Sequence, residues 1–149
     1  MRSIKNFLAF GLIAIAATAC SSGDVDLAKK INTDPSYVGK EVEISGKVET
    51  KFSIFVSSNS KYWNISLRTE SPFNNQNVES VPIRMTYGKG KNSIFLDIPD
   101  NQREYEEKDI KIYDKDGNVL AANDKIKIKG KVEKDNSGIY ITDMTVTKD

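Results

Sequence analysis

The chain has 149 residues, and its 22 basic and 21 acidic side chains nearly cancel, so it lacks the basic excess that nucleic-acid-binding domains carry. It contains no histidine, which removes the commonest general base and the commonest transition-metal ligand. A chain of this length fits one domain.

The first predicted element is a signal peptide over residues 1–19. Two basic residues near the start form a positive region, and the apolar run 7–17 that follows is too short to span a bilayer, which needs about 20 apolar residues. The segment 17–20, "ATAC", resembles the lipobox of bacterial lipoproteins, in which the cysteine is acylated and becomes the first mature residue. An ordinary secretory signal cleaved near Ala19 is the alternative.

Cys20 is the single cysteine, so the chain can form no internal disulfide, and an exported protein would carry one reactive thiol. Lipidation would remove that thiol, and a diacylglyceryl group together with an N-acyl chain suffices for stable anchoring. We therefore expect a protein of the bacterial cell envelope that is lipid-anchored to the outer membrane, on its periplasmic side or at the cell surface.

Residues 20–35 are predicted to form a lipidated tether and a short helix. Asp24 or Asp26 can cap a helix over residues 27–32. Pro35 ends this helix, because the residue before a proline is displaced from the helical region of backbone angles.

Residues 36–149 follow the two-residue period of β-strands. Val42 and Ile44 alternate with glutamates, as in a strand with one buried face. Glycines predict tight hairpin turns at 88–92 and 116–118. Further strands are predicted at 52–56, 62–68, 81–87, 93–98, 126–132 and 139–146, with a small hairpin over 109–121 and a polar loop at 70–80.

Two near-copies, "EVEISGKVE" (41–49) and "KIKIKGKVE" (125–133), each carry a glycine within a strand, Gly46 and Gly130. Such a glycine marks a bend or a close approach of backbones, which small closed barrels need. These segments resemble strands of the tRNA-anticodon-like OB-fold lipoproteins common in Bacteroidetes. The resemblance implies a mainly β fold: a five-stranded OB-fold barrel with a short N-terminal helix and an inserted β-hairpin within 97–122.

A ligand site is predicted on the second and third strands, the face that usually meets ligands in OB-folds. One aromatic ring and two guanidinium groups there can stack on and hydrogen-bond a base or a sugar. Trp63 points the other way and is predicted to lie in the core. The predicted site residues are Tyr62, Asn64, Arg68 and Arg84, with Ser66 and Thr86 beside them.

Three further motifs have a structural and a functional interpretation. "DKDGN" (114–118) lacks the spacing of a calcium loop and "GKGK" (88–91) lacks that of a phosphate-binding loop, so both predict turns. An acidic group can supply a catalytic carboxylate pair or hold a divalent cation, but the basic residues among its members favour a solvated loop. Its members are Asp97, Asp100, Glu104, Glu106, Glu107 and Asp109.

Lysines occupy every second position from 125 to 131, opposite the apolar face of the same strand. We call them the lysine row and predict that they face solvent beside the glutamates of the 41–49 strand, where they also discourage edge pairing. The alternative is a binding surface for anionic lipid, lipopolysaccharide phosphate or nucleic acid.

We therefore expect a non-enzymatic binding module, anchored to the membrane, that needs no cofactor and no metal. Its expected ligand is an envelope oligosaccharide or polysaccharide, a peptide or a partner protein, and nucleic acid is not expected. Two alternatives stay open: a hydrolase that uses the carboxylates of 97–109, and a purely structural envelope component. Two carboxylates about 5–9 Å apart in one cleft would favour the hydrolase.

Overall fold

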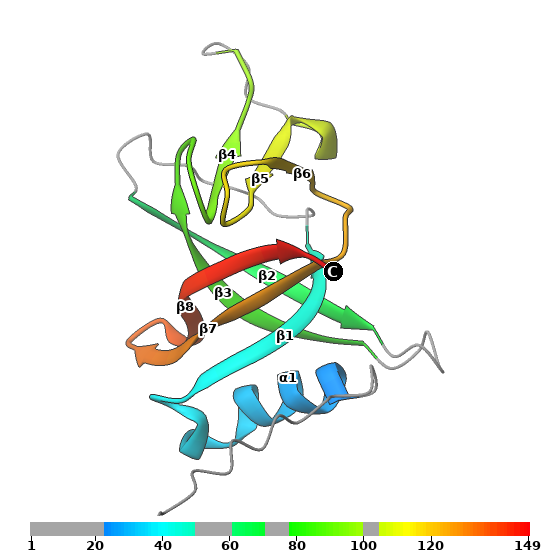
Figure 1. Ribbon diagram of the computed structural model, residues 1–149. Helices are drawn as coiled ribbons and strands as arrows, with labels where there is room; N and C mark the ends of the chain where they lie inside the picture. The colour runs from blue at the N-terminus through cyan, green and yellow to red at the C-terminus, as the bar shows by residue number, and fades with distance from the viewer. Residues whose placement is uncertain (1–22, 50–60, 71–77, 100–104) are drawn as a thin grey trace, which may run out of the picture.

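A computed structural model describes residues 23–49, 61–70, 78–99 and 105–149 (Figure 1). The predicted signal peptide, Cys20, the predicted strand 52–56, most of the polar loop 70–80 and two of the acidic residues, Asp100 and Glu104, lie outside the described residues. Within the described ranges, no helix is both long enough and apolar enough to cross a membrane.

Five strands close into a barrel, which confirms the predicted mainly β fold. Antiparallel pairs join β1 to β2, β2 to β3, β1 to β7 and β7 to β8, and a parallel contact between β3 and β8 closes the ring. This topology is compatible with an OB-like fold. The barrel strands are β1 (Glu41–Val48), β2 (Tyr62–Glu70), β3 (Val78–Tyr87), β7 (Ile126–Asp135) and β8 (Gly138–Lys148).

The barrel core is built by the alternate residues that the two-residue period predicted to point inward. Ile44, Ile83 and Ile128 are all buried there, one from each of three strands. Trp63 is only 5% exposed and packs against Tyr87, with the ring centroids 4.9 Å apart, so its predicted core position is confirmed.

Helix α1 (Gly23–Thr33) packs against β1, β2 and β3. It begins earlier than the predicted residue 27, because Asp24 is part of its first turn and is held against the barrel. The Oδ1 atom of Asp24 accepts a hydrogen bond of 3.2 Å from the backbone N–H of Ser45 on β1. The helix ends before Pro35, as predicted, and a short 3₁₀ helix, η1 (Pro35–Tyr37), follows.

Gly46 and Gly130 both lie where two backbones approach closely, as predicted. β1 pairs with β7 up to Gly46 and with β2 beyond it, and a Cβ atom at this position would collide with the carbonyl oxygen of Arg68. A Cβ atom on Gly130 would lie 2.7 Å from Cγ2 of Ile141 and 2.8 Å from the carbonyl oxygen of Thr142. Each glycine therefore allows one strand to contact its neighbour without a side chain between them.

Three short strands are inserted between β3 and β7: β4 (Ser93–Leu96), β5 (Ile110–Tyr113) and β6 (Val119–Ala121). They extend the sheet beyond the barrel, on the side away from α1 (Figure 1). β5 and β6 form the predicted hairpin, and its turn contains Gly117 at a φ of 90°. A short 3₁₀ helix, η2 (Glu107–Asp109), precedes β5.

The predicted hairpin between β3 and β4 is wrong, because β4 runs parallel to the end of β3, with Thr86 opposite Ser93. The connecting loop therefore returns the chain to the direction of β3, whereas a hairpin turn would reverse it. Its residues Gly88, Gly90 and Asn92 have positive φ angles of 134°, 154° and 52°. The hydroxyl of Ser93 holds this loop by sharing its one proton between the carbonyl oxygens of Gly88 and Gly90, which lie 2.8 and 2.9 Å away.

We expect Gly130→Ala to lower the free energy of unfolding by about 1–3 kcal/mol, because the added Cβ must displace the backbone oxygen of Thr142. Urea unfolding followed through the fluorescence of Trp63, the only tryptophan, measures this change. Lys129→Ala, on the exposed face next to it, is the control and should change stability by less than about 0.5 kcal/mol. An unchanged midpoint for Gly130→Ala would show that the close approach is not required.

Candidate functional site

The outward face of β2 and β3 carries the four residues of the predicted ligand site. Strand pairing places Asn64 opposite Arg84, and the Nε–H of Arg84 donates a hydrogen bond of 2.8 Å to Oδ1 of Asn64. Tyr62 lies at the start of β2, on the same face. Arg68 lies towards the other end of β2, where its Nε is 3.3 Å from the carboxylate of Glu70. Three of the four residues are therefore neighbours, and Arg68 is separate.

Arg84 is held in place on three sides. Besides the hydrogen bond to Asn64, a terminal nitrogen of Arg84 lies 2.9 Å from the carboxylate of Asp135. The guanidinium carbon also lies over the ring of Tyr140, 3.7 Å from the ring centroid. The backbone N–H of Ser137 and the guanidinium of Arg84 lower the pKa of the Asp135 carboxyl. Asp135 at the end of β7 and Tyr140 near the start of β8 thus fix the direction of the Arg84 side chain.

A pocket of about 250 Å³ opens next to this fixed guanidinium. It is lined by β2, β3, β8 and the loop between β3 and β4. Tyr62, Arg84 and Thr86 come from the predicted face, whereas Asn64 and Arg68 do not line the pocket. The described lining residues are Tyr62, Arg84, Thr86, Lys91, Asn92, Thr142, Asp143 and Met144.

Sequence reasoning missed the part of the pocket that β8 and the loop after β3 contribute. The single local signal is Asp143, a charged residue inside the strand-forming run "IYITDMTV". The local sequence pattern does not place Lys91 or Asn92 beside β8, because this contact joins segments about fifty residues apart. Asn92 and Val146, for example, are hydrogen-bonded across 54 residues of sequence.

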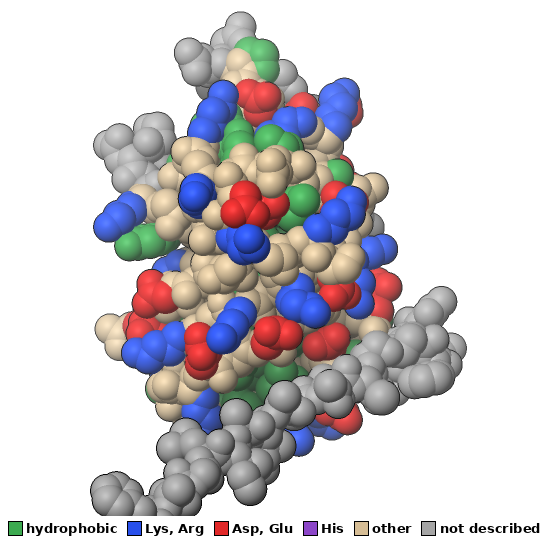
Figure 2. Space-filling model, viewed as in Figure 1, with side chains coloured by type: hydrophobic (Ala, Val, Ile, Leu, Met, Phe, Trp, Pro, Cys, Tyr) green, Lys and Arg blue, Asp and Glu red, His purple; other side chains and the backbone are tan. Residues whose placement is uncertain are grey.

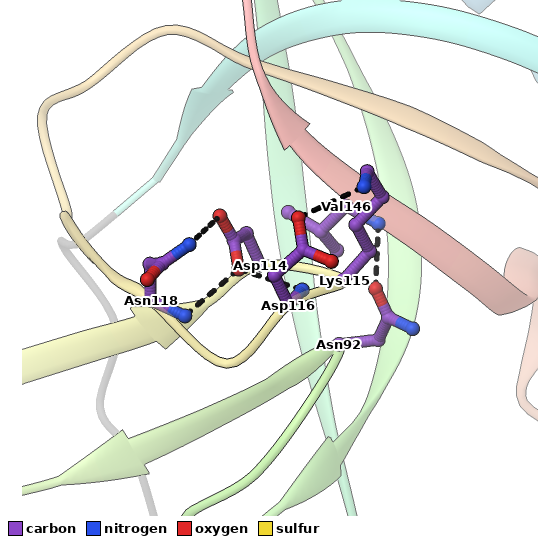
Figure 3. Close-up of polar contacts among 6 residues, drawn as sticks. All are labelled: Asn92, Asp114, Lys115, Asp116, Asn118 and Val146. Carbon is purple, nitrogen blue, oxygen red and sulfur yellow. Dashed lines mark hydrogen bonds and ion pairs between the residues drawn. The ribbon is translucent and has the colours of Figure 1, made fainter.

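The inserted strands are attached to β8 through the backbone of Val146 (Figure 3). Oδ1 of Asn92 accepts a hydrogen bond of 2.8 Å from the N–H of Val146. The N–H of Lys115 donates a hydrogen bond of 2.8 Å to the carbonyl oxygen of Val146. The N–H of Asn92 also donates to the carbonyl oxygen of Asp114 at 3.0 Å. These bonds hold the loop after β3 over the edge of β8, where it forms one side of the pocket.

"DKDGN" is a turn, as predicted, and Asp114 organises it (Figure 3). Oδ1 of Asp114 accepts hydrogen bonds of 2.8 Å from the N–H groups of Asp116 and Asn118, and the side chain of Asn118 donates to Oδ2 at 3.1 Å. The hydrogen bond from the Asn118 side chain is the main reason that the pKa of Asp114 is lowered. Within the described ranges, no group of three or more acidic or cysteine side chains is placed to hold a metal ion.

Three of the four described members of the acidic group, Asp97, Glu106 and Asp109, are occupied by local contacts. Asp109 caps η2 by accepting a 2.8 Å hydrogen bond from the N–H of Glu106, which in turn lies 2.7 Å from Lys108. Asp97 lies 4.0 Å from Lys89. A second cavity of about 500 Å³ lies between η2, β5 and β6, and Glu107 is the one carboxylate among its described lining residues. The described acids therefore do not converge in that cavity.

The lysine row lies beside acidic side chains, as predicted. Lys127 is 3.9 Å from Glu43 and Lys129 is 3.6 Å from Glu41, both on β1. The two end members pair with Asp149 and with Glu133. Figure 2 shows positive and negative side chains interspersed over this face of the molecule. The row is thus a set of exposed ion pairs.

Comparison with protein-family models, with curated proteins and with solved structures finds no match for this chain. The lining of the pocket between β2, β3 and β8 offers ammonium, guanidinium, carboxylate, amide and hydroxyl groups around one small volume. Tyr62, 45% exposed, adds an aromatic ring at its margin. Such a lining suits a small polar ligand more than an apolar one.

We expect the double substitution Lys127→Gln and Lys129→Gln to change the free energy of unfolding by about 1 kcal/mol or less, because exposed ion pairs contribute little. Binding to vesicles that contain anionic lipid should also be unchanged. Urea unfolding and vesicle co-sedimentation at low and physiological salt test both parts. A loss of vesicle binding that shrinks as salt rises would identify the row as a binding surface.

Proposed function

We propose that this protein is a lipid-anchored, non-enzymatic binding module of the bacterial cell envelope, and that its pocket between β2, β3 and β8 takes part of an envelope glycan. The observation that carries this proposal is the polar lining of the pocket, in which Lys91 and Arg84 are donors and Asp143 is an acceptor. A sugar ring presents hydroxyl groups that need both, and its apolar face suits an aromatic ring such as that of Tyr62.

The charges of the pocket favour a glycan over nucleic acid. Lys91 and Asp143 make no ion pair with each other or with another residue in the described part of the chain, so the free charges at the pocket are one of each sign. Arg84 is already paired with Asp135. A phosphate backbone needs a surplus of cations along a groove, and the paired lysine row supplies none.

The membrane anchor in this proposal comes from the sequence. The apolar run 7–17 and the segment "ATAC" support acylation of Cys20, and the strand segments with Gly46 and Gly130 resemble the tRNA-anticodon-like OB-fold lipoproteins of Bacteroidetes. Only two residues separate Cys20 from the start of α1 at Gly23. A lipid on Cys20 would therefore keep the barrel close to the membrane surface, within reach of envelope glycans.

A hydrolase and a purely structural role are the alternatives. A hydrolase of the carboxylate type needs two acids in one cleft. Among the described acids of 97–109, Asp109 caps η2, Asp97 and Glu106 pair with lysines, and Glu107 is the one carboxylate at its cavity. A purely structural component has no need of two unpaired, opposite charges at a pocket. Binding is therefore the function that the described residues support best.

We expect Cys20→Ser to release the protein from the membrane fraction, because the sulfur of Cys20 is the atom that would bond the diacylglyceryl group. Fractionation of cells, combined with metabolic labelling by a fatty acid, measures both attachment and acylation. Ser21→Ala is the control and should stay attached. A Cys20→Ser protein that remains membrane-bound and acylated would contradict the proposed anchor.

We expect the wild-type protein to bind neutral oligosaccharides on a glycan array and Arg84→Ala to bind them about tenfold more weakly, because a hydrogen bond from a charged group contributes about 1.5–3 kcal/mol. Arg68→Ala is the matched control: it removes the same side chain from the same face but outside the pocket. Equal losses for both variants, or no glycan bound by the wild type, would contradict the proposed site.

A further inference from the structure

β8 departs from regular pairing where it lines the pocket. Lys129 on β7 pairs with Thr145, and Lys131 pairs with Thr142. Between these pairs β7 has only Gly130, whereas β8 has two residues, Asp143 and Met144. This is a β-bulge, an extra residue that interrupts the ladder and redirects the side chains around it.

The burial of β8 shows why an extra residue is needed. Ile141 and Val146 are both fully buried, although they are five positions apart and strict alternation would place them on opposite faces. The bulge restores the alternation, so that Met144 is also buried. Asp143 is the residue released from the ladder, and its side chain is exposed at the pocket.

Gly130 makes the room that this bulge requires. A Cβ atom at position 130 would lie 2.8 Å from the carbonyl oxygen of Thr142 and 3.2 Å from Cβ of Met144, the residues on either side of Asp143. Asp143 itself has a φ of 50°, a left-handed conformation that glycine adopts freely and that aspartate and asparagine tolerate better than other residues with side chains. An aspartate can therefore occupy the bulge and present its carboxylate at the pocket.

The cationic and amide side chains around Asp143 offer donors to a ligand. Lys91 and Arg84 carry no acceptor, and Oδ1 of Asn92 is occupied by the N–H of Val146, which leaves its amide N–H groups. Asp143 is the one carboxylate among the described lining residues. Its side chain forms no hydrogen bond or ion pair with another described residue, so both oxygens are available to a ligand.

We infer that Asp143 determines the specificity of this pocket. Its carboxylate accepts hydrogen bonds from two adjacent hydroxyl groups of a neutral sugar, and its negative charge disfavours sugars that carry a carboxylate or a phosphate. The inference rests on the proposed function, because it assumes that the pocket takes a glycan. It goes beyond the face of β2 and β3, since the deciding residue belongs to β8.

Two matched pairs of probes test this inference: digalactose against digalacturonate, and mannose against mannose 6-phosphate. Amide shifts of Lys91 and Asp143 in ¹H–¹⁵N spectra report binding. We expect the wild type to bind the neutral member of at least one pair about tenfold or more tightly than the charged one. Asp143→Asn, which keeps the size and the tolerance of left-handed φ, should weaken neutral binding about tenfold and reduce the preference to about twofold, as expected for a lost charge-assisted hydrogen bond.

Asp143→Gly separates binding from folding. Glycine adopts a φ of 50° without steric cost, so this variant should unfold at no lower urea concentration than the wild type while losing neutral-sugar binding. Asp116→Asn, in the turn after β5, is the control for loss of one negative charge and should bind as the wild type does. If Asp143→Gly lowers stability and binding together, the residue has a structural role and the inference is wrong.

The outcomes also separate this inference from the proposed function. Neutral-sugar binding that survives both Asp143 substitutions would overturn the role of Asp143 and leave glycan binding intact. No shift of pocket amides by any of the four probes would overturn the assignment of the pocket to these glycans, and the role of Asp143 with it.

Discussion

The close approach of β7 and β8 at Gly130 is the constraint on which the rest of the structure depends. Because no side chain stands at this position, β8 can carry one extra residue while Ile141 and Val146 both stay in the core. The same extra residue exposes Asp143 at the barrel surface with a φ of 50°. The absence of a side chain at Gly130 therefore allows both the packing of β8 in the core and the exposure of the Asp143 carboxylate at the pocket.

The second requirement is that the backbone N–H and C=O groups of β8 find hydrogen-bond partners where β8 extends past β3. An unpaired strand edge exposes N–H and C=O groups, and such groups are normally paired or covered. Here Asn92 and Lys115 bond both backbone groups of Val146. These bonds hold the loop that contributes Lys91 to the pocket. The site is thus built by backbone hydrogen bonding around the barrel, together with the fixed guanidinium of Arg84.

Local sequence patterns predicted the parts of the fold that depend on neighbouring residues. The alternation of apolar and polar residues located β2, β3 and β7. The two glycines within strands indicated the close approaches between strands of a barrel. The parallel pairing of β4, the bulge at Asp143 and the bond from Asn92 to Val146 depend on contacts between distant segments, which a two-residue period does not encode. For the same reason the predicted face included Tyr62 and Arg84 but not the pocket residues of β8.

Backbone chemical shifts and cross-strand nuclear Overhauser contacts of the folded protein test the central claim most directly. They should show a positive φ near 50° at Asp143, with Lys129 opposite Thr145 and Lys131 opposite Thr142. That result would place the carboxylate outside the ladder, at the pocket. An extended Asp143, with β7 and β8 paired one to one past Gly130, would contradict the claim that this glycine creates the site.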